Sequence, residues 1–266
     1  MATTFVRPVQ LALDYEQRVL WAVTLFPLLA VALIAACKLT PRLYMAVIRE
    51  DGLVEWATAL VYCVATAFAV SLVFHFWRDK EKIYALLYGI LAIGMFFVAM
   101  EEISWGQRQL GLETPDTIRD INYKGEFNLH NVSSFPLHES YIVVGLYGAF
   151  SRLISTSLLR IRNKKFINLL TPPYALCLYF FIPFAYYAYT EILYYTVLLP
   201  SGLQWSDYWN DEHFIIGKDQ EPLELLLSFG FLLFTMFNWI RYRVGAPLTL
   251  RWSADAAQDR SSDPIP

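Results

Sequence analysis

Residues 53–77 read LVEWATALVYCVATAFAVSLVFHFW, an apolar run whose single acidic residue, Glu55, lies near its start. At about 1.5 Å per residue, a helix of this length exceeds the roughly 30 Å hydrocarbon core of a bilayer. A short charged turn follows, and then a second apolar run at residues 83–100. Two such runs in succession predict a pair of antiparallel transmembrane helices.

The composition of the whole chain supports the same class of protein. Of its 266 residues, 56% are hydrophobic and 17% are charged, and the mean hydropathy is +0.38. A soluble core does not absorb so large an apolar share, so part of this surface must face lipid. The net charge of -3 gives no reason to expect a nucleic-acid partner. We therefore expect an all-α, polytopic transmembrane bundle whose first partner is the lipid bilayer.

Six runs are expected to span the membrane, namely residues 19–37, 53–77, 83–100, 141–159, 174–199 and 222–240. The run at 141–159 is the weakest because Arg152 and several Ser and Thr residues interrupt it, so its full crossing stays open. Residues 101–140 are too many for a simple turn and are expected to fold as a polar outer loop. Residues 1–250 would then form a single bundle, and residues 251–266 a disordered cytoplasmic tail.

The orientation follows from the basic residues. With six spans both termini lie on one side, and 14 of the 21 Lys and Arg residues fall on that side. Cytoplasmic loops retain Lys and Arg, so we expect both termini in the cytoplasm of a bacterium and the bundle in its inner membrane. Most acidic residues and three of the four histidines fall on the outer side.

The first apolar run could instead be a cleaved signal peptide. Ile34-Ala35-Ala36-Cys37 fits a lipoprotein processing pattern, but Asp14 and Glu16 are unusual in the region that precedes such a signal. Whether Cys37 is lipidated therefore stays open.

The strongest local motif is EEISWGQR at residues 101–108, at the outer end of the third span. If the helix continues past Met100, Glu101 and Arg108 share a face with Ser104 and Trp105. Adjacent carboxylates near hydrocarbon repel each other and lose solvation, so one should keep a proton or a cation should hold both. We expect Glu101, Glu102 and Arg108 to be catalytic. The alternative is an interfacial anchor, with Trp105 among the headgroups and Arg108 paired to Glu101 or Glu102.

Glu191 is the fourth candidate catalytic residue. It lies about eight residues inside the outer end of the fifth span, hence roughly 12 Å deep. An ionisable group at such depth marks a functional site by default. The alternative is a structural carboxylate satisfied by Arg108 or by neighbouring tyrosines, which are Tyr187, Tyr194 and Tyr195.

His130, His138 and His213 are the candidate metal ligands. They lie among acidic residues on the outer side, although their spacing matches no zinc motif such as HExxH. Imidazole and carboxylate groups suit zinc, iron or manganese, so a divalent metal such as zinc is the cofactor that we expect. The alternative is that these are ordinary loop histidines.

Further carboxylates at similar depth come from Glu55 and from Glu224, which follows Glu221 by one turn.

Three blocks resemble an uncharacterised family of bacterial polytopic membrane proteins. They are Arg49–Trp56, with the pattern EDGxxEW, Glu101–Arg108, with EEISWGQR, and Asn128–Asn131. The resemblance extends over most of the chain. It implies a bacterial membrane protein and brings no activity or site residue with it.

Three classes of function remain. The first is a metal-assisted hydrolase or transferase that acts on a lipid or lipid-linked substrate at the outer leaflet. The second is a proton- or cation-coupled transporter, and the third is an accessory or assembly subunit of a membrane complex. The absence of an internal repeat around Pro27 and Pro183 weakens transport. We favour the enzyme, with one outward pocket formed by Glu101, Glu102, Arg108, His130, His138 and Glu191.

Overall fold

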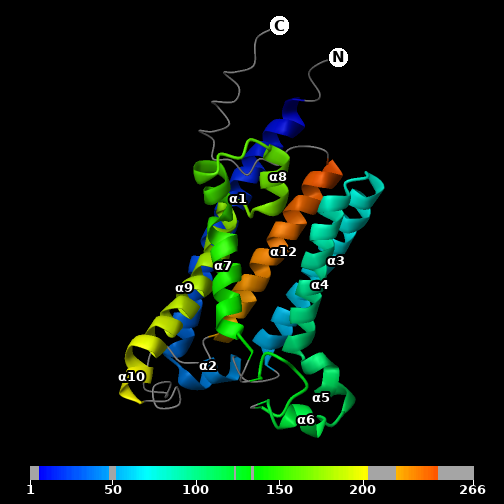
Figure 1. Ribbon diagram of the computed structural model, residues 1–266. Helices are drawn as coiled ribbons and strands as arrows, with labels where there is room; N and C mark the ends of the chain where they lie inside the picture. The colour runs from blue at the N-terminus through cyan, green and yellow to red at the C-terminus, as the bar shows by residue number, and fades with distance from the viewer. Residues whose placement is uncertain (1–5, 48–51, 123, 133–134, 203–219, 245–266) are drawn as a thin grey trace.

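The computed structural model describes residues 6–47, 52–122, 124–132, 135–202 and 220–244. These residues form helices joined by turns, with an isolated antiparallel bridge between Asn122 and Val132. Six helical segments among them are long and apolar enough to cross a membrane. They run up and down along an elongated bundle (Figure 1). The expected all-α transmembrane bundle with six spans is confirmed.

The six spanning segments are built on α1 (Val6–Lys38), α3 (Leu53–Arg78), α4 (Lys82–Glu102), α7 (Leu137–Leu153), α9 (Cys177–Leu193) and α12 (Gln220–Val244). Two π-helical turns and a short helix extend α7 and α9, namely η2 (Ile154–Leu158), η4 (Tyr194–Leu198) and α10 (Leu199–Ser201). Shorter helices lie at the bundle ends, namely α2 (Pro41–Val47), η1 (Ser104–Gly106), α5 (Gln107–Leu110), α6 (Asp116–Arg119), α8 (Lys164–Leu170) and η3 (Tyr174–Leu176).

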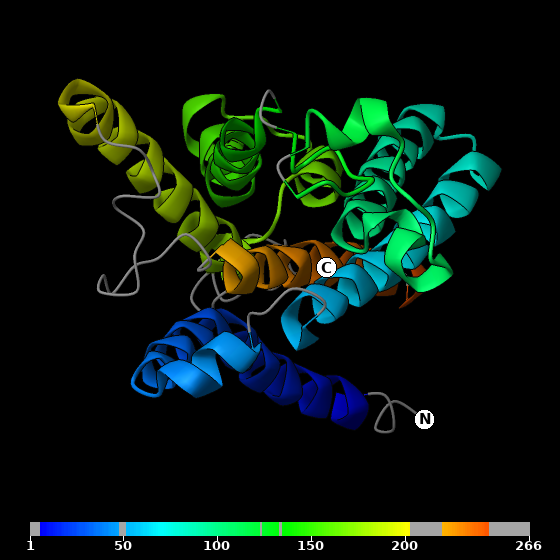
Figure 2. The ribbon, with the colours of Figure 1, turned by 90° about the horizontal axis from the view of Figure 1, so that it is seen from below.

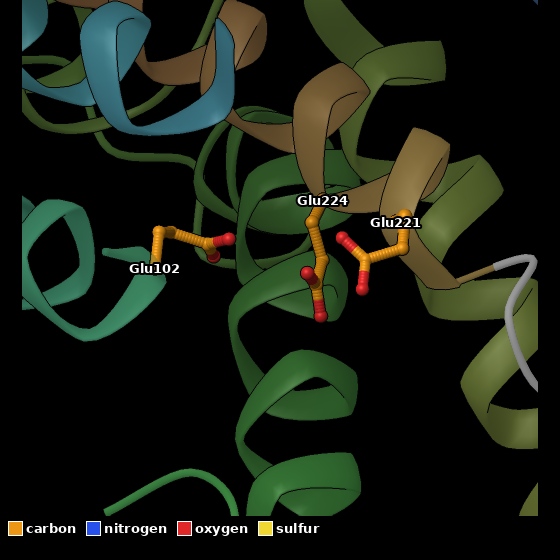
Figure 3. A group of neighbouring side chains, drawn as sticks. All are labelled: Glu102, Glu221 and Glu224. Atoms are coloured by element: carbon orange, nitrogen blue, oxygen red, sulfur yellow. The ribbon is translucent and has the colours of Figure 1, made fainter. Parts of the chain in front are cut away.

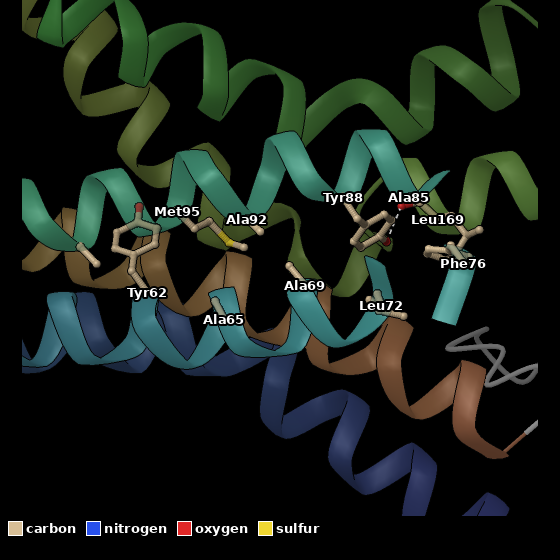
Figure 4. Packing of buried hydrophobic residues seen from close by; sticks show 11 residues of the cluster. Tyr62, Ala65, Ala69, Leu72, Phe76, Ala85, Tyr88, Ala92, Met95 and Leu169 are labelled. Carbon is tan, nitrogen blue, oxygen red and sulfur yellow. Dashed lines mark hydrogen bonds between the residues drawn. The ribbon is translucent and has the colours of Figure 1, made fainter. Parts of the chain in front are cut away.

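Small residues bring α3 and α4 together. Ala65 and Ala69 on α3 and Ala85, Ala92 and Ala99 on α4 are all buried in one cluster between the two helices, and Figure 4 labels all of them except Ala99. The α4 alanines recur every seven residues, which places them on one face of the helix. Without a strong hydrophobic force between helices in lipid, such small side chains favour association because they let the backbones approach closely.

The second close pair is α7 with α9. An added Cβ at Gly148 would lie 2.1 Å from Cδ1 of Phe180, and one at Gly145 would lie 2.7 Å from Cβ of Phe184. Only glycine fits such a contact. The helix α12 packs against both α3 and α9 and therefore joins the two pairs, and it lies centrally in the end-on view (Figure 2).

Arg152 interrupts the expected span 141–159 without ending it. Its guanidinium donates to the carbonyl oxygens of Pro172 and Thr171, at 2.9 and 3.2 Å, and to Oδ1 of Asn168 at 3.3 Å. The backbone oxygens of Thr171 and Pro172, which follow α8, thus accept hydrogen bonds from the charged guanidinium. Helical structure continues from Leu137 to Leu158, long enough for a membrane span.

We call the end of the bundle where α3 begins, α4 ends and α12 begins the acidic end. It lies at the bottom of Figure 1, where η1, α5 and α6 form the polar loop that follows α4. The described residues of this loop are folded, but α7 already begins at Leu137, within the range 101–140 that was expected for the loop. The expected tail at 251–266 and His213 lie outside the described residues.

Candidate functional site

A cavity of about 470 Å³ lies at the acidic end, between α4, α7 and α12, and α3 and the polar loop also line it. Its acidic lining consists of Glu55, Glu101, Glu102, Glu126, Glu221 and Glu224. Lys124 and His130 are also part of the lining. The remaining wall is mainly apolar and includes Ile90, Phe97, Val98, Val144 and Phe231. The cavity thus has an acidic part and an apolar part.

The helical repeat explains why two of these carboxylates face inward. Glu102 follows Met95 by seven residues, and Met95 follows Tyr88 by seven, so Glu102 continues the buried stripe of α4. On α12, Glu224 precedes the buried residues Leu227 and Ser228 by three and four positions, so it lies on the same face of that helix. The exposed fractions are accordingly small, 8% for Glu102 and 7% for Glu224.

Glu102, Glu221 and Glu224 meet across the cavity. One carboxylate oxygen of each lies within 4.8 Å of those of the other two, although Glu102 comes from α4 and the others from α12 (Figure 3). The hydroxyl of Tyr187 donates to Oε1 of Glu224 at 3.2 Å. Three carboxylates this close in a buried place are stable only when protons or a cation balance their charge. We call these three residues the carboxylate cluster.

Glu101 has a different environment from its neighbour Glu102. Its carboxylate accepts hydrogen bonds from Nε1 of Trp105 at 2.7 Å and from the amides of Leu129 and His130, at 2.6 and 3.0 Å. His130 Nδ1 also lies 3.5 Å from the same carboxylate. Glu101 therefore ties the polar loop to the end of α4.

The expected shared face beyond Met100 is wrong, because α4 ends at Glu102. The chain then turns through three residues with positive φ, which are Ser104 at 46°, Trp105 at 54° and Gly106 at 74°. For non-glycine residues this conformation costs about 1–2 kcal/mol each. The bond from Trp105 to Glu101 and the packing of its ring 5.9 Å from that of Phe97 help to hold the turn.

Arg108 pairs with neither Glu101 nor Glu102 in the described structure, unlike in the alternative of an interfacial anchor. Its guanidinium contacts Glu55 of α3 at 3.1 Å and Glu126 of the loop at 2.9 Å. Oε2 of Glu126 also accepts from Oγ of Ser104 at 2.9 Å. Arg108 therefore joins the loop to α3 beside the cavity, and it is not among the lining residues.

Glu191 and His138 form a separate pair, in which Nδ1 of His138 lies 2.5 Å from Oε1 of Glu191. Neither residue lines the cavity. The ring of Tyr187 connects the two places, since it lies 5.2 Å from the His138 ring and stacks on Tyr141 at 4.5 Å. Glu191 is thus hydrogen-bonded, but its partner is a histidine of α7 instead of the expected tyrosines or Arg108.

The structure brings together part of the expected outward pocket. Glu101, Glu102 and His130 line one cavity, whereas Arg108 lies beside it and His138 and Glu191 pair behind its wall. Among the described residues, the group whose ligand atoms could hold a metal consists of carboxylates alone and includes neither His130 nor His138.

Sequence reasoning gave too little weight to Glu126, Tyr187 and the pair Glu221 and Glu224. For the last two, the available signal was their spacing of one helical turn at the start of an apolar run. Glu126 and Tyr187 carry no comparable pattern, because their partners are 18 and 37 residues away in sequence.

No family model, no curated protein and no solved structure matches the chain.

Proposed function

We propose that the chain is a membrane enzyme, a hydrolase or transferase, that acts on a lipid or lipid-linked substrate bound in the cavity at the acidic end. The observation that carries this proposal is a single cavity with a carboxylate-lined part and an apolar part. This combination matches the two chemical halves of an amphiphile.

The volume and walls suit such a ligand. About 470 Å³ falls within the range of roughly 300–1,000 Å³ typical of small-molecule sites. On α4 the lining includes Ile90, whose side chain is 59% exposed on the helix surface that would face lipid. The helices α4 and α7 are not a closely packed pair, unlike α3 with α4 or α7 with α9. An acyl chain can therefore lie between them with its head toward the carboxylates.

The charge of the lining limits the substrate. Six carboxylates against Lys124 and His130 disfavour an anionic headgroup and favour one that is neutral or carries an amine. We propose that the bond cleaved is an ester or amide bond of such a lipid.

Glu102 is the residue placed to act as general base. It is buried, and within the described structure no hydrogen bond engages its carboxylate, whereas Glu101 is held by the loop. In hydrolysis, Glu102 takes a proton from water while the water oxygen bonds to the carbonyl carbon. The bond to the leaving oxygen or nitrogen then breaks, and Glu102 returns the proton to the leaving group. A substrate hydroxyl in place of water makes the same step a transfer.

A coupled transporter is the second candidate, because acidic residues at membrane depth also suit cation binding. Against it, the buried faces of α3 and α4 beyond the cavity are mainly apolar among the described residues. They include Ala65, Ala69, Leu72 and Ala92, which offer a cation no ligand. We therefore rank transport below catalysis, and an accessory role below both.

We place the acidic end on the outer side of a bacterial inner membrane, with both termini in the cytoplasm. The excess of Lys and Arg on the side of the termini supports this orientation. The substrate would then be a lipid of the outer leaflet.

Turnover in nanodiscs tests the proposal. Purified protein is reconstituted with total lipid from its expression host, and lipid products are followed by mass spectrometry. Wild type and the exposed-loop control Glu113→Gln should convert a lipid, and Glu102→Gln should be slower by about 100- to 10,000-fold.

Equal rates for wild type and Glu102→Gln would contradict the assigned base. No lipid turnover by wild type would reject the enzyme. Ion-driven uptake into liposomes would then support the transporter. A protein that co-purifies in a fixed stoichiometry would support the role of an accessory subunit.

A further inference from the structure

We infer that Glu102, Glu221 and Glu224 form a binding site for a hard divalent cation of the Mg²⁺, Mn²⁺ or Ca²⁺ type. The use of this cation in lipid chemistry rests on the proposed function, in which Glu102 gives one carboxylate oxygen to the cation and keeps the other for proton transfer. The binding of the cation does not rest on that function.

The spacing of the ligand atoms fits one ion. Oxygens on opposite sides of a cation are separated by twice the metal–oxygen distance, about 4.2 Å for Mg²⁺ and about 4.6–5.2 Å for Ca²⁺. In the carboxylate cluster the three oxygens lie within 4.8 Å of one another. One ion can therefore contact all three with little side-chain movement.

Glu102 supplies a second and independent reason. Its side chain is directed into the carboxylate cluster (Figure 3), and the residue is only 8% exposed. Within the described residues its carboxylate has no hydrogen-bond donor, although the adjacent Glu101 accepts three hydrogen bonds. The Glu102 carboxylate therefore faces the cavity with no donor among the described residues, which leaves its oxygens available to a cation.

Among the described residues, no basic side chain forms an ion pair with Glu102. Arg108 contacts Glu55 and Glu126, and it is not among the cavity-lining residues. Lys124 also lines the cavity, but one ammonium group cannot balance three carboxylates. A divalent cation adds the missing positive charge at the point where the three side chains meet.

The donor type selects the class of cation. Three carboxylate oxygens without imidazole or thiolate favour Mg²⁺, Mn²⁺ or Ca²⁺ over zinc. The inferred site thus differs in metal class and in ligands from the zinc site expected at His130, His138 and His213. Tyr187 orients one ligand, since its hydroxyl donates to Glu224 at 3.2 Å and its ring stacks on Tyr141. Such supporting bonds commonly matter nearly as much as the ligands.

Titration with Mn²⁺ tests the site. The free Mn²⁺ signal in electron paramagnetic resonance is measured against protein in nanodiscs that lack anionic lipid. We expect one saturable Mn²⁺ per wild-type chain, displaced by Mg²⁺ or Ca²⁺. Glu102→Gln and Glu224→Gln should abolish it, Tyr187→Phe should weaken it by about tenfold, and Glu113→Gln should leave it unchanged.

The thermal midpoint checks that the variants fold. Mn²⁺ should raise the midpoint of wild type and not that of Glu102→Gln, although the metal-free variant should be at least as stable because one repelling charge is gone. No saturable binding by wild type overturns the inference, as does binding that Glu102→Gln and Glu224→Gln leave unchanged. Mn²⁺ binding without lipid turnover would support the cation site and reject the proposed enzyme. Lipid turnover without Mn²⁺ binding would support the enzyme and reject the cation site.

Discussion

Arg108 offers the clearest quantitative test of how the polar loop is held over the cavity. Arg108→Met removes a guanidinium that contacts Glu126 at 2.9 Å and Glu55 at 3.1 Å. The side-chain exposures are modest, at 24% for Arg108, 16% for Glu126 and 15% for Glu55, so solvent screens these pairs only in part. Methionine keeps the apolar length of the side chain but removes the guanidinium contact from both carboxylates.

The expected loss follows from these contacts. A hydrogen bond to a charged group contributes about 1.5–3 kcal/mol, and discounting two of them for partial exposure leaves about 3 kcal/mol. Because about 1.4 kcal/mol corresponds to a factor of ten, amides of the loop between Ser104 and Asn131 should exchange hydrogen about 100-fold faster. Mass spectrometry of deuterium uptake in nanodiscs measures this change peptide by peptide.

A matched control separates the loop contacts from a general effect of losing a positive charge. Arg78 forms an exposed pair with Asp79 at the opposite end of α3, so Arg78→Met should leave loop exchange within about threefold of wild type. If Arg108→Met also stays within that range, the two ion pairs do not hold the loop, and the described positioning of Glu126 at the cavity would be refuted.

Three further predictions concern packing, the separate pair and topology. Gly148→Val should lower unfolding stability by at least about 1–3 kcal/mol because of the contact with Phe180, whereas Gly89→Val, which has open space, should be near neutral in the same thermal melt. Glu191→Gln should lower stability by about 1 kcal/mol through its bond to His138 and keep most lipid turnover, since neither residue lines the cavity; full loss of turnover would contradict this. A reporter fused after Arg243 should be active in the cytoplasm, and activity only outside would overturn the six-span orientation.

Much of the fold could be predicted from the sequence, because the bilayer sets the length of each apolar run. The runs at 53–77 and 83–100 differ from the observed α3 and α4 by one or two residues at an end. The run at 141–159 was harder to judge because the partners of Arg152 are backbone oxygens of Thr171 and Pro172, and no sequence pattern reveals such contacts.

The candidate site was less accessible to sequence reasoning. Its place at one end of the bundle was predictable, because several carboxylates gather near the ends of apolar runs that meet there. The partners were not, since the left-handed turn at Ser104–Gly106 redirects the chain and moves Arg108 away from Glu101 and Glu102. Continuing the seven-residue stripe from Met95 to Glu102 would have placed Glu102 inside the bundle.

The most direct test of the amphiphile site is a cryo-electron microscopy map of the protein in nanodiscs of host lipid, with an antibody fragment as a fiducial mark. We expect an elongated lipid density between α4 and α7, against Phe97 and Val144, with its head at Glu102 and Glu224. A map in which α4 and α7 pack directly together, with Glu102 turned toward the bulk headgroups, would contradict the proposed function.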